Sequence, residues 1–206
     1  MTAADTLSLL DWKRRVFALY AEVRANDEPE RAWRHWRDTR DELFRAHPQS
    51  PLPLRRRDDF AGLDYFPYDP GARVTAELAD ADADADPEPV PTSGARPLLF
   101  RRFARASFDL HGQPQALDLH WLEGYGGGAF LAFRDATSGR ETYGGGRYVL
   151  DTVKGADLGS ESGRLVLDFN FAYNPSCAYD PGWVCPLAPP ANTLPAAVAA
   201  GERQPA

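Results

Sequence analysis

Residues 116–133 read ALDLHWLEGYGGGAFLAF, and this stretch decides the fold class. From Ala116 to Trp121 apolar and polar residues alternate, which is the period of a strand with one buried face. Three glycines at 126–128 mark a turn, and the apolar run 129–133 follows. The stretch therefore predicts two strands joined by a turn.

The same period extends in both directions from this stretch. Strands are predicted at 73–78, 98–103, 106–110, 116–121, 129–133, 146–150 and 164–170. Segments rich in glycine, proline and serine separate them, and no helical pattern alternates with them, so a parallel sheet is not expected. We predict an antiparallel β-sandwich or barrel.

Two amphipathic helices are predicted ahead of the strands, at 7–25 and 29–47. In both, apolar residues recur at intervals of three and four, which is the period of one helix face. Pro29 suits a first helical turn, and Pro48 ends the second helix because the residue before a proline resists the helical conformation. The predicted fold class is α+β, mainly β.

A length of 206 residues suits one domain, 1–206. Within it we expect a helical segment, 1–47, packed on a β body, 73–195. Residues 79–92 begin with alternating alanine and aspartate and hold few large apolar groups to offset the entropy of ordering. We therefore predict a flexible acidic loop at 79–92.

Composition narrows the range of partners. The net charge of −7 and the pI near 5.1 lack the basic footprint of a nucleic-acid-binding protein. No window holds the run of apolar residues that a membrane span needs, and no export signal is visible. We expect a cytoplasmic protein that binds neither nucleic acid nor membrane; the sequence indicates no particular cofactor or oligomeric state.

Polar residues gather in two stretches inside the strand pattern, 134–148 and 168–185. Arg134 and Arg147 carry planar guanidinium groups that suit a carboxylate or a phosphate. We predict that they bind a small anionic ligand where the two stretches meet. The alternative is an internal network in which these arginines pair with carboxylates such as Asp135.

The same stretches hold candidates for proton transfer. Glu141 and Asp168 are candidates for acid–base work, and Tyr143 is a candidate proton donor. Asp168 and Asn170 share one face of a predicted strand, and Asn174 follows, so these residues are candidates for a ligand-binding rim. Alternatively, the Asp and Asn side chains cap backbone amides of the loops. Whether the protein is an enzyme stays open at this point.

Cys177 and Cys185 lie eight residues apart in a segment rich in turns. Three alternatives remain: free structural thiols, a disulfide, or a metal pair that needs two further ligands. The four histidines show no ligand spacing, so we predict no metal site.

Several long motifs resemble those of a known family. They run FAGLDYFP at 60–67, RDATSGRETYGGGRY at 134–148, DFNFAYNPSCAY at 168–179, CPLAPPANTL at 185–194 and AGE at 200–202. In these motifs the chain resembles the bacterial and archaeal domain-of-unknown-function family 1684. One departure is Ala191, which stands where the family commonly has a glutamate. The resemblance covers most of the chain and implies no function.

Three hypotheses follow. The preferred one is an enzyme or small-molecule binder whose site is formed by 134–148 and 168–185. The second is a non-enzymatic interaction or structural module in which the polar motifs form an internal arginine–carboxylate lattice. The third is a metal-binding protein that uses Cys177 and Cys185.

Overall fold

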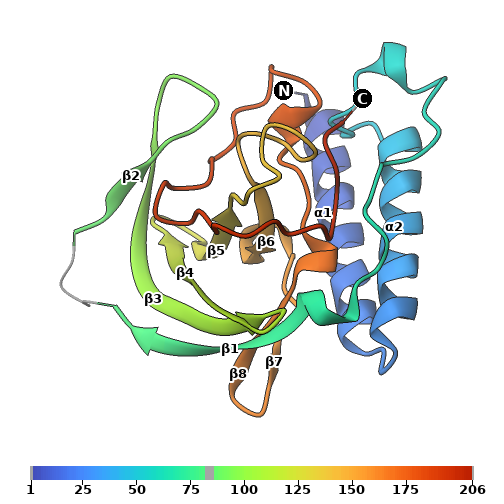
Figure 1. Ribbon diagram of the computed structural model, residues 1–206. Helices are drawn as coiled ribbons and strands as arrows, with labels where there is room; N and C mark the ends of the chain where they lie inside the picture. Colours follow the sequence, from blue (N-terminus) through green and yellow to red (C-terminus); the bar gives the residue numbers. More distant parts are fainter. Residues whose placement is uncertain (1, 82–85, 206) are drawn as a thin grey trace.

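The computed structural model describes residues 2–81 and 86–205. Two helices lie beside one curled antiparallel sheet, which forms a half-barrel (Figure 1). This confirms the predicted class, α+β and mainly β with two N-terminal helices. None of the described helices is both long and apolar enough to cross a membrane.

The helices are α1 (Ala3–Arg24) and α2 (Pro29–Ala46). Thr2 caps α1, since its hydroxyl accepts a hydrogen bond from the backbone N–H of Asp5 and the Asp5 carboxylate accepts one in return. In α2, the apolar face buries Trp33, Trp36 and Phe44. This face packs toward the sheet, and charged residues cover the rest of the helix.

The sheet contains eight strands in the described part of the chain, and all their pairings are antiparallel. They are β1 (Arg73–Asp80), β2 (Glu88–Val90), β3 (Leu98–Leu110), β4 (Gln113–Leu122), β5 (Gly128–Phe133), β6 (Arg147–Asp151), β7 (Ser160–Glu161) and β8 (Arg164–Asp168). Their order is β6-β5-β4-β3-β1-β8-β7, with β2 paired to β3.

Two predictions about strand limits were wrong: the division at 98–110 and the end of the strand 164–170. The segments 98–103 and 106–110 form one strand, β3, whose register against β4 shifts between Arg102 and Ala104. Such a bulge adds a residue to one strand and interrupts the alternation that the prediction relied on. In the region predicted as a flexible loop, 79–92, β1 extends to Asp80 and β2 forms a short strand; residues 82–85 lie outside the described residues.

The predicted strand 164–170 ends early, at Asp168. The Asp168 carboxylate accepts a hydrogen bond of 2.9 Å from the backbone N–H of Asn170, and residues Phe169–Phe171 form a short 3₁₀ helix. Asp168 and Asn170 therefore do not share a strand face. An aspartate side chain that bonds to a backbone N–H two residues later competes with strand pairing in this way.

Two hydrophobic clusters hold the fold together. The first joins the helices to the sheet and includes Trp36, Phe130, Tyr148 and Phe171. The second lies between the sheet and the C-terminal segment, which contributes residues such as Leu194 and Val198. In Figure 1 this segment, drawn in red, crosses the concave side of the sheet toward the helices.

Gly201 sets the path of the C-terminal segment. Its carbonyl accepts a 3.0 Å hydrogen bond from the backbone N–H of Phe66. Gly201 has a φ of +78°, and a Cβ there would lie 2.6 Å from the carbonyl oxygens of Phe169 and Ala172. Only glycine combines the left-handed conformation with this close approach of backbone.

Gly201→Ala should therefore destabilise the protein more than Gly139→Ala. Gly139 has nearly the same φ, +81°, but nothing lies within 4 Å of an added Cβ. We expect about 1–2 kcal/mol for Gly139→Ala from the left-handed backbone alone, and about 1–3 kcal/mol more for Gly201→Ala from the clash. Urea unfolding of both variants measures the loss in the free energy of unfolding. Equal losses would show that the close approach of the backbone at Gly201 does not contribute to stability.

Candidate functional site

A buried ion pair occupies the first polar stretch. The Arg147 Nη2 atom lies 2.8 Å from Oδ2 of Asp135, and the two side chains are 1% and 0% exposed. The Arg147 guanidinium also donates hydrogen bonds to the backbone carbonyls of Val198, at 3.0 Å, and Ala200. Burial lowers the pKa of Arg147, and the charge of Asp135 opposes that shift. Arg147 is thus already paired inside the protein.

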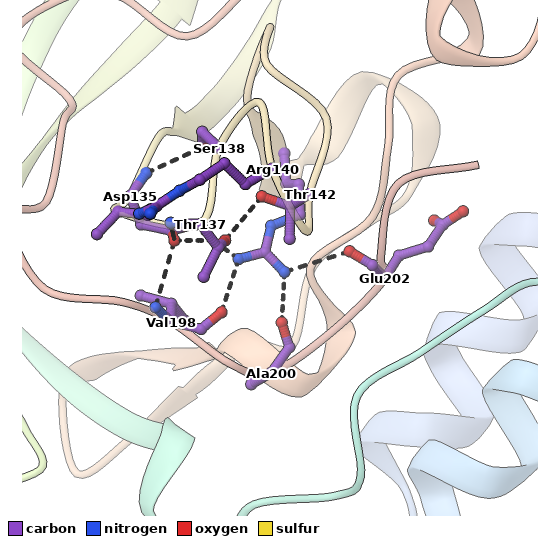
Figure 2. A network of polar contacts seen from close by, with 10 residues as sticks. Asp135, Thr137, Ser138, Arg140, Thr142, Val198, Ala200 and Glu202 are labelled. Carbon is purple, nitrogen blue, oxygen red and sulfur yellow. Dashed lines mark hydrogen bonds and ion pairs between the residues drawn. The ribbon is translucent and has the colours of Figure 1, made fainter. Parts of the chain in front are cut away.

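The second carboxylate oxygen of Asp135 extends this network. It accepts hydrogen bonds from the backbone N–H of Thr137 at 2.7 Å, from the Thr137 hydroxyl at 2.6 Å and from the backbone N–H of Val198 at 3.3 Å. The Thr137 hydroxyl in turn lies 2.8 Å from that of Thr142. Figure 2 shows these groups gathered around the Asp135 carboxylate. The network joins the loop after β5 to the C-terminal segment.

A second ion pair, between the largely buried Arg40 and the buried Glu202, joins α2 to the same segment. Nη2 of Arg40 lies 2.9 Å from Oε2 of Glu202, whose side chain is 1% exposed. That oxygen also accepts a 3.0 Å hydrogen bond from the backbone N–H of Asn174. The guanidinium carbon of Arg40 lies 4.7 Å from the Trp36 ring centre and 5.1 Å from that of Tyr173. Burial raises the pKa of Glu202, although Arg40 opposes the shift.

Sequence reasoning missed this second pair. Arg40 lies among many charged residues of α2, and the sequence around it does not indicate that its side chain is buried. In the sequence, Glu202 stands out only as part of the motif AGE at 200–202. The Asn174 amide nitrogen donates to the Arg203 carbonyl at 2.7 Å, so this candidate ligand-binding residue is engaged in holding the C-terminal segment.

The remaining candidates lie in separate surroundings. Arg134 is half-buried, and its backbone pairs with the segment around Thr193. Glu141 is exposed, and its backbone carbonyl accepts a hydrogen bond from Gln204. The Tyr143 hydroxyl lies 3.6 Å from the sulfur of Cys177. No hydrogen bond or ion pair within residues 2–81 and 86–205 joins Glu141 and Tyr143 to Asp168.

Asp168 borders a cavity of about 510 Å³. The cavity lies between the turn that joins α1 to α2, the start of β1, the end of β8 and the segment that leads into β7. Its charged residues are Arg24, Asp27, Arg73, Glu161 and Asp168. Small-molecule sites commonly have this volume and a few convergent polar groups.

The two oxygens of the Asp168 carboxylate have different surroundings. Oδ1 accepts hydrogen bonds from the Asn170 backbone N–H at 2.9 Å and from the Asn170 amide at 2.8 Å. Oδ2 is buried and has no hydrogen-bond partner among the described residues. Burial raises the pKa of Asp168 to about 6, while the Asn170 hydrogen bonds and Arg73 pull it down. Near neutral pH the carboxyl can therefore both accept and release a proton.

Cys177 and Cys185 are both buried and not joined by a disulfide. Among the residues that the structure describes, no three or more histidine, cysteine or acidic side chains are grouped to hold a metal ion.

Comparison with known proteins gives the family. The family described as "Protein of unknown function (DUF1684)" matches residues 58–203. The chain belongs to the DUF1684 family. Its similarity to an uncharacterized protein of Haloarcula marismortui, whose structure was solved in solution by NMR, extends over 84% of this chain and 93% of that one, with 38% identity and a TM-score of 0.59. No curated protein matches the chain.

Membership in DUF1684 confirms the resemblance drawn from the motifs, and it assigns no activity. The geometry shows what several motif residues do in this member of the family. Asp135, Arg147 and Glu202 form ion pairs inside the protein.

Arg147→Ala should destabilise the protein by about 3–5 kcal/mol, because it leaves the Asp135 carboxylate buried without its counter-charge. Arg140→Ala is the matched control, since Arg140 is exposed and bonds only locally to the carbonyl of Ala136; we expect a change within about 0.5 kcal/mol. Chemical denaturation gives both values. A melting temperature that Arg147→Ala leaves unchanged would contradict the structural role.

Asp168→Asn should change stability in a way that depends on pH. The folded pKa of about 6 exceeds the unfolded value of about 3.9, so the folded state holds the extra proton between them. The stability that this proton contributes is present below about pH 4 and is lost as the pH rises through about 6. Asparagine does not titrate. The free energy of unfolding of the variant, relative to that of the wild type, should therefore rise by about 2–3 kcal/mol between pH 4 and pH 7.5.

Urea unfolding at both pH values measures this difference. Asp109→Asn controls for the loss of a capping carboxylate, since the exposed Asp109 accepts a 2.7 Å hydrogen bond from the backbone N–H of Gly112. A difference between wild type and Asp168→Asn that stays constant with pH would count against a raised pKa.

Proposed function

We propose that this protein binds a small polar molecule in the cavity that Asp168 borders, and that the molecule carries a hydrogen-bond donor next to an anionic group. The unpartnered Oδ2 of Asp168 carries the proposal. A buried acceptor without a partner costs about 1–3 kcal/mol. A hydroxyl or ammonium group of a ligand would supply the missing donor and remove that cost.

Two arginines favour an anionic group on the same ligand. Arg73 is the direct cross-strand neighbour of Asp168, and it also borders the cavity with Arg24. Arg73 pairs with Glu161, and Arg24 donates to the backbone carbonyl of Asp157 at 2.6 Å. Each guanidinium has five N–H donors, so both keep donors for a carboxylate or phosphate.

The proposed site includes one residue of the site predicted from the sequence, Asp168, and lies elsewhere in the fold. Asp168 remains a candidate for ligand binding and proton transfer, because its pKa near 6 suits a general base. The expected anion site moves from Arg134 and Arg147 to Arg24 and Arg73, since Arg147 is sealed in its pair with Asp135. Glu141, Tyr143, Asn170 and Asn174 are left outside the proposed site.

NMR titration tests the proposal. Small α-amino acids and 2-hydroxy acids carry both a donor and an anionic group, whereas simple amines and simple carboxylates carry one each. We expect the bifunctional compounds to shift the amide signals of residues 23–32, 158–161 and 168, and the simple compounds to do so more weakly.

Asp168→Asn should weaken binding of the bifunctional compounds at least tenfold, because a hydrogen bond to a charged group contributes about 1.5–3 kcal/mol and about 1.4 kcal/mol corresponds to a factor of ten. Asp109→Asn, which alters an exposed carboxylate outside the cavity, should leave binding unchanged. The proposal fails if the shifts cluster elsewhere on the protein, or if both variants bind as the wild type does.

A second candidate function is the structural or interaction module. The enclosed network around Asp135 and Arg147 favours it, because polar residues of the motif at 134–148 make their contacts inside the protein. A protein that shows no shifts at the cavity with any compound of the panel would favour this second candidate.

A further inference from the structure

Two cysteines that do not border the proposed cavity form a contact pair. Cys177 belongs to a short 3₁₀ helix, Ser176–Ala178, and Cys185 follows the exposed segment 181–184. The backbone N–H of Cys177 donates a hydrogen bond to the Cys185 sulfur at 3.4 Å. The Cys185 sulfur therefore lies against the backbone of Cys177, although eight residues separate the two in the sequence.

The contacts around the two thiols are not equivalent. Cys177 faces the Tyr143 hydroxyl at 3.6 Å, whereas the backbone N–H of Cys185 donates to the Ser93 hydroxyl at 3.0 Å. The neighbouring Cys185 thiol, together with the Tyr143 hydroxyl, lowers the pKa of Cys177 to about 6, although burial opposes the shift. The pKa of Cys185 is raised well above its usual value by the neighbouring Cys177 and by burial.

This asymmetry matches the division of work in a dithiol. The thiolate is the attacking form of cysteine, and neighbouring hydrogen-bond donors stabilise it. A protonated thiol in contact with it can attack next, as a resolving cysteine does. Two inert core thiols would need neither contact with each other's residue nor a hydroxyl group beside one sulfur.

We propose that Cys177 and Cys185 form a thiol–disulfide exchange site, in which Cys177 attacks a small-molecule disulfide and Cys185 resolves the product. The Cys177 thiolate bonds to one sulfur of the disulfide, and the other sulfur leaves as a thiolate. Cys185 then loses its proton to solvent and bonds to the Cys177 sulfur, releasing a second thiolate. One small disulfide is reduced to two thiolates while the two protein thiols are oxidised to one disulfide.

Pulse labelling of the wild-type protein tests the order of reactivity. The chain has two cysteines, so every labelled thiol is assigned by peptide mass. With a small excess of iodoacetamide near neutral pH, Cys177 should be alkylated at least ~10-fold faster than Cys185, since it alone is largely thiolate there. Equal rates, or faster labelling of Cys185, would overturn the assignment.

Incubation with bis(2-hydroxyethyl) disulfide tests the exchange itself. The wild type should lose the mass of two hydrogens and release two equivalents of 2-mercaptoethanol. Cys185→Ser should stop at the mixed disulfide on Cys177 with one equivalent released. Cys177→Ser should react at least ~10-fold more slowly than Cys185→Ser. A wild type that keeps both thiols under excess disulfide, or single variants that react at one rate, would overturn the proposal.

Tyr143→Phe tests the neighbouring hydroxyl as a positioning group. It removes the contact to the Cys177 sulfur and keeps the ring. Formation of the mixed disulfide in the Cys185→Ser background should slow, while the melting temperature stays close to that of its parent. An unchanged rate would remove Tyr143 from the site.

Discussion

The buried ion pair between Asp135 and Arg147 is the contact on which the C-terminal half of the structure depends. Removing two charges from water is expensive, and their attraction offsets the loss only when further hydrogen bonds complete both groups. Here the arginine donates to the backbone carbonyls of Val198 and Ala200, and the aspartate accepts from the backbone N–H groups of Thr137 and Val198. The pair therefore requires the C-terminal segment to lie across the sheet as it does.

The rest of the packing follows from that placement. With the segment held, Leu194 and Val198 close the hydrophobic cluster on the sheet, and Glu202 reaches the Arg40 guanidinium on α2. The helices are thus tied to the half-barrel by an ion pair as well as by the aromatic cluster around Trp36. Polar residues of the long motifs thus hold the C-terminal segment and the helices on a sheet that does not close into a barrel.

The two proposed sites lie outside this lattice. At one, a carboxylate oxygen of Asp168 is buried at the edge of a cavity without a partner. At the other, two buried cysteines lie in contact, and the pKa of Cys177 is lowered while that of Cys185 is raised. Functional sites are where a fold tolerates such incompletely satisfied groups, because ligands or reagents complete them. The two sites use different residues and different chemistry, so the tests of one do not bear on the other.

The sequence by itself determined the class of fold and the family. Helix and strand periods are local properties, and they located both helices and most strands within a few residues. The periodicity mispredicted the structure after Asp168, where a side-chain hydrogen bond to the backbone takes the place of strand pairing. It also mispredicted the bulge between Arg102 and Ala104. Which charges pair was decided by tertiary structure alone. Arg40 and Glu202 lie 162 residues apart, and a charged residue looks the same in the sequence whether it meets solvent, a partner or an empty cavity.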